Sequence, residues 1–274
     1  MMQRFGGRMG NIPPVVLNLL IINILLFLAT MLLRHQGLDL ERWLALYYPG
    51  SDYFKPYQLI THMFMHANTM HIFFNMFALW MFGRVLEGVW GSKRFMIYYF
   101  VTGLGAAGFY LFVNFLQLGS IVADANAAIN TLSPEVFAEF VKEHFPRHME
   151  RISAFMSGWV NDPGNPGYFK EATDFINLTV SQKLNVPTVG ASGAIFGLLL
   201  AFGMLFPNTR LMLIFPPIPI KAKWFVIIYG AIELYLGLRG SPTDNVAHFA
   251  HLGGMIFGFI MIKYWNKTNR KRFY

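Results

Sequence analysis

Four side chains in this sequence are of the types that carry out nucleophilic catalysis on a carbonyl. Ser192 lies among glycines and alanines at the start of one apolar run. His71 and Asn75 begin a second apolar run, and His251 lies near the start of a third. Polar groups inside apolar segments are costly to bury and usually functional. These residues are therefore candidates for a reaction centre.

Together the four residues are sufficient for acyl transfer by a serine. A serine hydroxyl is a weak nucleophile that needs a base within hydrogen-bond reach. His251 can accept the proton of Ser192 and later donate it to a leaving amine. His71 and Asn75, at i and i+4, share one helix face. With the backbone N–H of Ser192 at a helix start, they can bind the oxyanion. No acidic residue lies at matching depth in these three runs, so the sequence predicts a Ser–His dyad.

Each residue also has a simpler structural interpretation. A serine among small residues commonly serves close helix packing, and Gly254 and Gly258 form a small-xxx-small pair of the same kind. A histidine in a membrane helix is often only a hydrogen-bond partner between helices or part of a proton path. The common depth of all four residues favours the catalytic interpretation over packing alone.

The elements that must position these residues are membrane helices. Hydrophobic residues make up 55% of the chain and charged residues 13%. The apolar runs are close to the ~20 residues that a helix needs to cross the hydrocarbon layer. They lack the alternation of barrel strands. The fold class is therefore all-α, a polytopic membrane protein with six spanning helices, of which the fourth and fifth are short. The predicted spans are residues 14–33, 68–86, 95–116, 190–206, 222–238 and 246–264.

The distribution of basic residues predicts the orientation. Lysines and arginines concentrate before residue 14, around 84–94 and 210–223, and after 262, which places both termini in the cytoplasm. The second, fourth and sixth helices then run inward, and the four candidate side chains lie about 5–12 Å below the outer surface. The net charge of +8 therefore reflects topology and contact with anionic lipids rather than nucleic-acid binding. The first run is predicted to be an uncleaved signal-anchor.

Residues 118–188 differ from the rest of the chain and are predicted to form an extracytoplasmic insertion. They are rich in acidic residues and contain no spanning run. Ser133-Pro134-Glu135 is typical of a helix start. Three amphipathic helical patterns follow, which could lie on the outer membrane surface or form a small helical subdomain packed on the loops. No catalytic motif is present there. The chain has no cysteine, which excludes disulfides and thiolate ligands, and we expect no metal and no other cofactor.

Several motifs resemble those of a known family, the rhomboid intramembrane serine proteases. The matching segments are His71-x-x-x-Asn75, Gly190-Ala191-Ser192-Gly193, His251-x-x-Gly254-x-x-x-Gly258 and the turn Glu87-Gly88-Val89-Trp90-Gly91-Ser92. The resemblance covers all six runs. It implies a single rhomboid-like membrane domain over residues 1–274, in which residues 118–188 are a long third loop.

The resemblance also implies roles for individual residues. Ser192 would be the nucleophile and His251 its base, while His71 and Asn75 would bind the oxyanion. Phe196 would support the His251 ring, and the small residues Gly190 and Gly193 would surround the serine. His248 is the competing base. The residues three and seven positions after it are His251 and Met255 rather than glycines, so His248 is expected to form a hydrogen bond nearby instead.

By the same resemblance, the chain would cut single-pass transmembrane proteins near the outer membrane face. The short N-terminal tail has no Arg/Ser-rich transit segment, which favours a bacterial inner membrane over an organellar one. Substrates would pass beside helix 222–238 and the loop 239–244, where Gly240, Ser241 and Pro242 could form a mobile cap. Glu233 is either a satisfied structural group or part of this lateral gate. The alternative function is a non-catalytic relative that binds membrane helices as a chaperone or in quality control. No oligomeric state is predicted.

Overall fold

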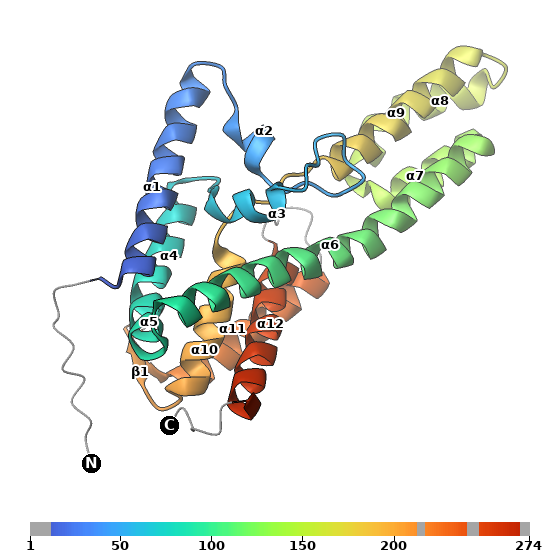
Figure 1. The fold of residues 1–274 in the computed structure, drawn as a ribbon. Helices are drawn as coiled ribbons and strands as arrows, with labels where there is room; N and C mark the ends of the chain where they lie inside the picture. Colours follow the sequence, from blue (N-terminus) through green and yellow to red (C-terminus); the bar gives the residue numbers. More distant parts are fainter. Residues whose placement is uncertain (1–11, 213–216, 240–246, 269–274) are drawn as a thin grey trace. The chain divides into compact units, whose positions relative to one another are not determined.

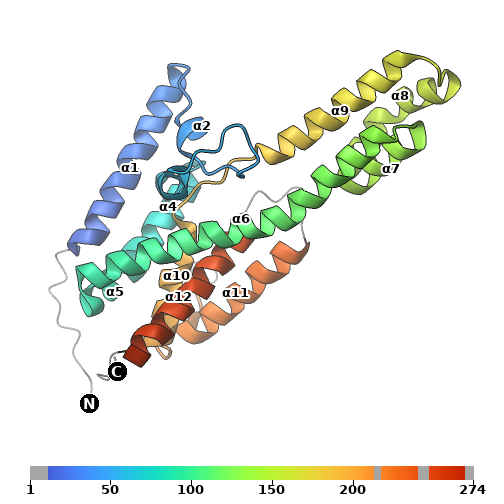
Figure 2. The same cartoon turned by 45° about the vertical axis from the view of Figure 1, so that its right-hand side comes forward.

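The computed structural model describes residues 12–212, 217–239 and 247–268, and helices make up most of them (Figures 1 and 2). A short antiparallel hairpin, which was not predicted, pairs β1 (Arg210–Met212) with β2 (Pro219–Lys221). The chain divides into two compact units. Unit 1 contains the described residues up to Leu46, then 56–110 and those from Thr188 onward; unit 2 contains 47–55 and 111–187.

A helix is found in every predicted span. They are α1 (Pro14–His35), the continuous segment of α4 (Thr69–Ala78), η2 (Leu79–Gly83) and α5 (Arg84–Trp90), then α6 (Ser92–Asn130), α10 (Ser192–Leu205), α11 (Ala222–Arg239) and α12 (His248–Thr268). Among the described residues, three segments are long and apolar enough to cross a membrane: 14–35, 69–90 and 92–130. Helix α10 is apolar but shorter. The all-helical class is confirmed, and the count of six spans stays a prediction.

The segment between α1 and α4 contributes three short helices, α2 (Leu40–Leu44), α3 (Gln58–Thr61) and η1 (His62–Phe64). An isolated bridge between Leu46 and Thr188 joins this segment to the residues before α10. The backbone hydrogen bonds run in both directions, at 2.9 and 2.8 Å. The residues preceding Ser192 are thereby fixed by a part of the chain more than 120 positions earlier.

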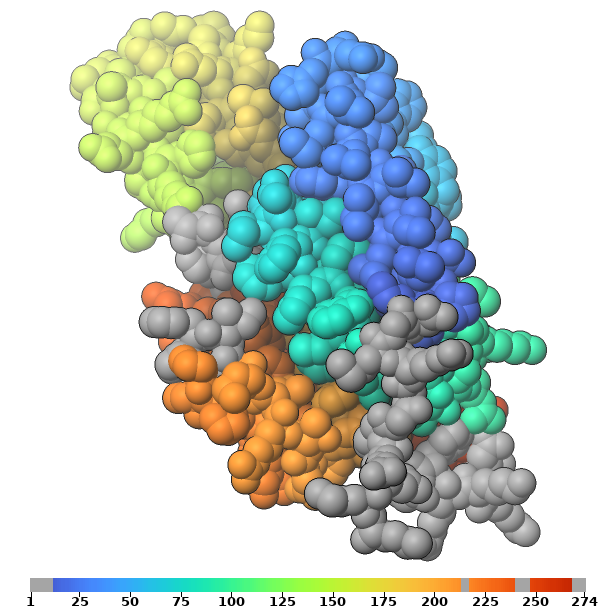
Figure 3. All heavy atoms as spheres, turned by 90° about the vertical axis from the view of Figure 1, so that its left-hand side faces the viewer, coloured from blue at the N-terminus to red at the C-terminus, as the bar shows by residue number. Residues whose placement is uncertain are grey.

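Helix α1 begins where a buried carboxylate accepts its first free amides. Pro14 occupies the first helical position, which suits its fixed φ angle and missing N–H. Glu87, only 2% exposed, accepts from the amides of Val15 at 3.0 Å and Val16 at 2.8 Å, and also from Ser92 Oγ at 2.6 Å. These amides would otherwise lack partners at a helix start. The turn around Glu87 therefore serves to hold the start of α1. Figure 3 shows α1 lying against α4.

Helices α10 and α12 lie side by side (Figure 2). They approach closely because glycines face each other where they cross. A Cβ on Gly254 would collide with the backbone carbonyl of Gly193. A Cβ on Gly258 would lie 3.4 Å from the Cα of Gly197 on α10, and it would also meet the hydroxyl of Tyr98 on α6. The prediction that small residues let these two helices come together is confirmed.

Unit 2 contains α7 (Pro134–His144), η3 (Pro146–His148), α8 (Met149–Asn161), α9 (Pro166–Leu184) and the second half of α6. Helix α6 continues to Asn130, well past the end predicted at 116, because no proline interrupts it before Pro134. Ser133 caps α7 as predicted, its Oγ accepting from the amide of Val136. The unit has a hydrophobic core of its own, which favours a helical subdomain. It comprises Leu118, Ile121, Ala125, Ala128, Phe137, Phe140, Val141, Ile152, Trp159, Ala172, Ile176 and Val180.

Candidate active site

Ser192 and His251 meet at the crossing of α10 and α12. Ser192 is the first residue of α10, and His251 lies in the first turn of α12. The distance between Ser192 Oγ and His251 Nε2 is 2.9 Å, a hydrogen bond. His251 is 8% exposed, so the pair is shielded from bulk solvent on the imidazole side. The geometry is that of a hydroxyl beside its general base.

The imidazole of His251 is held flat against an aromatic ring. Phe196, one turn after Ser192 on α10, stacks on it with ring centroids 4.1 Å apart and planes 6° from parallel. The ring of Tyr229 on α11 also packs against Phe196, with centroids 5.7 Å apart. The contact between Phe196 and His251 is the one that the resemblance implied. It restricts rotation of the ring that faces Ser192.

Gly190 forms the turn that leads into α10. Its φ angle of +124° lies in a region that only glycine adopts readily. Its amide donates to the carbonyl of His62 at 2.9 Å. A Cβ at this position would lie 2.7 Å from His71 Nε2 and 3.7 Å from Ser192 Oγ. His71 and Ser192 therefore both lie next to Gly190, on the side that a larger residue would fill.

Helix α4 carries two of the predicted oxyanion donors, His71 and Asn75. Asn68 caps α4 by accepting from the amide of His71 at 2.9 Å, which fixes the start of the helix. Asn75 lies one turn further on the same face and is 6% exposed. Within the described part of the chain its Nδ2 has no hydrogen-bond partner. The amide of Ser192 is among the first of α10, a group that no intrahelical carbonyl can satisfy.

Two further histidines, His62 and His66, support the site without titrating near neutral pH. Burial lowers the pKa of each from 6.5 to about 4. The Nδ1 of His62 contacts the carbonyl of Gln58 at 2.8 Å, while the ring of His66 packs edge-on against His71 with centroids 5.1 Å apart. Both rings are neutral at pH 7. They add no positive charge beside His71.

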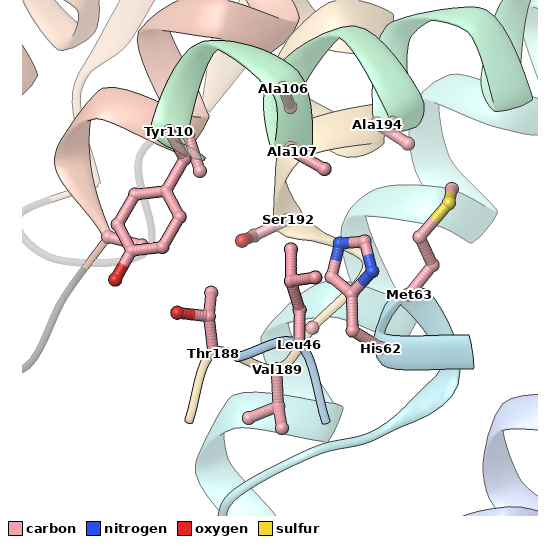
Figure 4. A pocket seen from close by; sticks show the side chains of 15 residues that line it. Leu46, His62, Met63, Ala106, Ala107, Tyr110, Thr188, Val189, Ser192 and Ala194 are labelled. Carbon is pink, nitrogen blue, oxygen red and sulfur yellow. The ribbon is translucent and has the colours of Figure 1, made fainter. Parts of the chain in front are cut away.

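A small cavity of about 20 Å³ borders the serine (Figure 4). Its wall includes Ser192, His62, Tyr110 and Thr188, and the Ser192 hydroxyl points into it in the figure. The volume is close to what one water molecule requires. The site therefore has room for a second reactant of that size next to the nucleophile.

Glu233 is the residue that sequence reasoning assigned to another role. It lies on α11, is 6% exposed, and its Oε2 contacts His251 Nδ1 at 2.9 Å and His248 Nδ1 at 2.6 Å. His248 thus forms a hydrogen bond nearby, as predicted. The sequence predicted a dyad because the three apolar runs that carry the other site residues hold no acidic residue at matching depth. The available signal was a lone glutamate in an apolar helix. Glu233 lies six residues before the end of α11 and His251 three residues after the start of α12, so the two lie near the ends at which these consecutive helices are connected.

The comparisons with known proteins identify the family. A family model described as the rhomboid domain matches residues 53–140 and 164–267, most of the chain. This chain belongs to the rhomboid family. The rhomboid is 26% identical over 192 residues to the rhomboid protease GlpG of Yersinia pseudotuberculosis, covering 69% of this chain and 62% of that protein. It is 32% identical over 100 residues to GlpG of Klebsiella pneumoniae, covering 36% of each.

The rhomboid thus spans about 62% of the length of the Yersinia relative. Family membership and its apolar helices support an integral membrane protein. The sequence-predicted residues all lie in unit 1: Ser192, His251, His71, Asn75, Phe196, Gly190 and Gly193. Gly240, Ser241 and Pro242, predicted as a cap, lie outside the described residues, as does Val246 at the start of the sixth predicted span.

Proposed function

We propose that this rhomboid is an intramembrane serine endopeptidase that uses Ser192 as nucleophile and His251 as general base. The observation that carries the proposal is the 2.9 Å hydrogen bond from Ser192 Oγ to His251 Nε2, formed inside an apolar helix bundle. In this mechanism the Ser192 oxygen attacks a peptide carbonyl while its proton moves to His251. The same proton then passes to the leaving amine, and the peptide C–N bond breaks to give an acyl-serine.

His71, Asn75 and the amide of Ser192 would stabilise the negative oxygen of the tetrahedral intermediate. Asn75 Nδ2, which has no partner within the described residues, supports this role, as do the first amides of α10, which no intrahelical carbonyl can satisfy. A water molecule in the cavity beside Ser192 would then attack the acyl-serine, with His251 as its base. Atoms balance: one water is consumed and one peptide bond is cleaved.

The proposed substrates are single-pass transmembrane proteins, cut near the outer membrane face. This proposal depends on six spanning helices, cytoplasmic termini and an extracytoplasmic unit 2. The asymmetric distribution of basic residues supports that orientation. The names of the similar GlpG proteases support both the hydrolytic activity and a bacterial inner membrane.

A fluorophosphonate probe tests the nucleophile directly, because it reacts with an activated serine. We expect labelling of the purified protein to vanish in Ser192→Ala and to slow by about 1,000-fold in His251→Ala. Ser153→Ala removes an exposed serine of unit 2 and is expected to label normally. In proteoliposomes, Asn75→Ala should lower the cleavage rate of a single-pass substrate by about 100-fold.

Labelling that persists in Ser192→Ala would contradict the proposal. So would a wild-type protein that neither reacts with the probe nor cuts any single-pass substrate. If such a protein nevertheless bound transmembrane segments, the non-catalytic function of a membrane-helix chaperone would be the correct one.

A further inference from the structure

Glu233 connects the proposed catalytic pair to a second histidine through one carboxylate oxygen. Its Oε2 lies 2.9 Å from His251 Nδ1 and 2.6 Å from His248 Nδ1, and His251 Nε2 lies 2.9 Å from Ser192 Oγ. The three acidic and imidazole side chains are all buried. An acid, a base and a hydroxyl are therefore aligned across α11, α12 and α10.

We propose that Glu233 is a positioning residue for the proposed serine protease chemistry, so that the centre is a Ser192–His251–Glu233 triad with His248 as a second support. This inference rests on the proposed function. It adds an acid that acts through His251 and never touches the substrate.

The first step of the argument concerns which imidazole nitrogen carries the proton. An ionised carboxylate only accepts hydrogen bonds, so His251 Nδ1 must donate to Glu233 and must carry a hydrogen. In a neutral ring Nε2 is then the unprotonated nitrogen. Ser192 can donate its O–H to Nε2, which is the arrangement that a general base requires. Glu233 therefore selects the reactive tautomer of His251.

The second step concerns charge during the reaction. When the Ser192 proton moves to Nε2, the His251 ring becomes a cation with both nitrogens protonated. Glu233 already carries the compensating negative charge, in contact with Nδ1. In a buried site of low dielectric such a contact is far stronger than in water. The proton stays on His251 until the leaving amine takes it, and Glu233 remains ionised throughout.

The third step explains His248. An isolated buried carboxylate is unfavourable unless hydrogen bonds satisfy it. His248 lies one turn before His251 on the same helix face and supplies the second donor to the same oxygen. This bond holds the carboxylate in one orientation. His248 thereby has a role although it does not contact Ser192.

A purely structural role for Glu233 would be to tie α11 to α12, and a metal site is a second alternative, since ligand atoms of Glu233, His248 and His251 lie within 4.8 Å of one another. Each of these alternatives predicts a different result from the positioning role of Glu233. The titratable groups around His251 are Glu233 and Tyr229 of α11, His248 of its own helix and His71 of α4. Only Glu233 among them supplies a negative charge at neutral pH.

The first measurement is the rate of substrate cleavage as a function of pH in full-length Glu233→Gln. We expect kcat to fall by about 100-fold or more, with KM changed by less than about threefold. Without the negative charge His251 holds a proton less well, so the acid limb of the rate profile should move to lower pH. Glu233→Asp keeps the charge and should retain the wild-type acid limb, with a smaller loss of kcat.

Glu87→Gln is the matched control, because Glu87 is also a buried carboxylate of unit 1 and accepts its hydrogen bonds from Val15, Val16 and Ser92 rather than from a histidine. It should reduce thermal stability without moving the acid limb. A kcat in Glu233→Gln equal to wild type would overturn the proposal, as would a loss of rate with an unmoved acid limb. Inactivation of the wild-type protein by a chelator would instead indicate the metal site and overturn the positioning role of Glu233.

A second measurement does not require activity. In protein labelled with ¹⁵N-histidine, NMR should show His251 protonated at Nδ1, with a downfield proton resonance that moves upfield in Glu233→Gln. A His251 ring protonated at Nε2 in the wild-type protein would overturn the positioning role of Glu233 even if the variant does not fold. An Nδ1-protonated His251 in a protein that cuts no substrate would support the positioning of His251 by Glu233 and contradict only the proposed function.

Discussion

At the scale of single residues, Gly190 combines an unusual backbone conformation with close contact to side chains of the candidate site. Its φ of +124° allows the chain to turn into α10, and its missing Cβ leaves room for the ring of His71. The bond from its amide to the carbonyl of His62 fixes the turn. One glycine thus sets the separation of Ser192 from a proposed oxyanion donor.

Gly190→Ala is expected to reduce cleavage strongly, because the added methyl group would displace His71. A displacement near 1 Å of a reacting or stabilising group lowers rates by about 100-fold, so we expect a loss of about 10- to 100-fold in kcat. The measurement is steady-state cleavage together with thermal unfolding.

Gly37→Ala separates the two possible causes of this loss. Gly37 also has a positive φ, of +80°, but nothing lies within 4 Å of its Cβ position. Its substitution should cost about 1–2 kcal/mol of stability from backbone strain alone and leave kcat unchanged. Equal losses of activity in both variants would show that strain, rather than displacement of His71, is responsible.

At the scale of elements, the crossing of α10 and α12 determines whether a site exists at all. The backbones are close enough that a Cβ on Gly254 would overlap the carbonyl of Gly193. Backbone cannot rotate away as a side chain can, so the helices themselves would have to separate. Any separation lengthens the bond between Ser192 and His251.

Gly254→Ala is therefore expected to destabilise unit 1 by about 3 kcal/mol, the upper part of the range for overpacking, and to abolish fluorophosphonate labelling. The matched control is Gly108→Ala on α6, where nothing lies within 4 Å of the Cβ position. That variant should be neutral or more stable by about 0.5–1 kcal/mol, since alanine favours a helix over glycine. Normal labelling in Gly254→Ala would contradict the close crossing.

At the scale of the whole molecule, unit 1 contains every residue of the candidate site, while unit 2 has a separate hydrophobic core. Phe137 is 1% exposed at the centre of that core, in contact with the rings of Phe155, Trp159 and Phe175. The hydrogen bonds that join Ser192, His251 and Glu233 lie within unit 1. The two cores can therefore be perturbed one at a time.

Phe137→Ala is expected to destabilise unit 2 by about 3–5 kcal/mol, the usual cost of removing a buried phenylalanine. Limited proteolysis should then cut within residues 111–187, while fluorophosphonate labelling of Ser192 continues at the wild-type rate. Phe169→Ala removes a side chain that is 47% exposed and should change neither result, because such surface positions contribute within about 0.5 kcal/mol. Loss of labelling in parallel with proteolysis would show that the site depends on unit 2.

The sequence by itself determined the helical class, the presence of a helix in each apolar run and the choice of Ser192, His251, His71 and Asn75 as the candidate group. It could do so because an apolar run long enough to cross a membrane, and a polar residue within such a run, are both local patterns. Helix starts at Ser133 and Pro14 were equally local. The length of α6 was not a local pattern, because a helix can continue from an apolar run into a polar segment without any residue that marks the change.

Only the tertiary structure brought Glu233 to His251. Depth can be counted along each helix, but the rotation of α11 about its own axis depends on how its side chains pack against α10 and α12. That packing is a property of three helices together, and the spacing of apolar residues along α11 alone does not reveal it. The sequence therefore predicted a dyad, and the fold placed a carboxylate behind it.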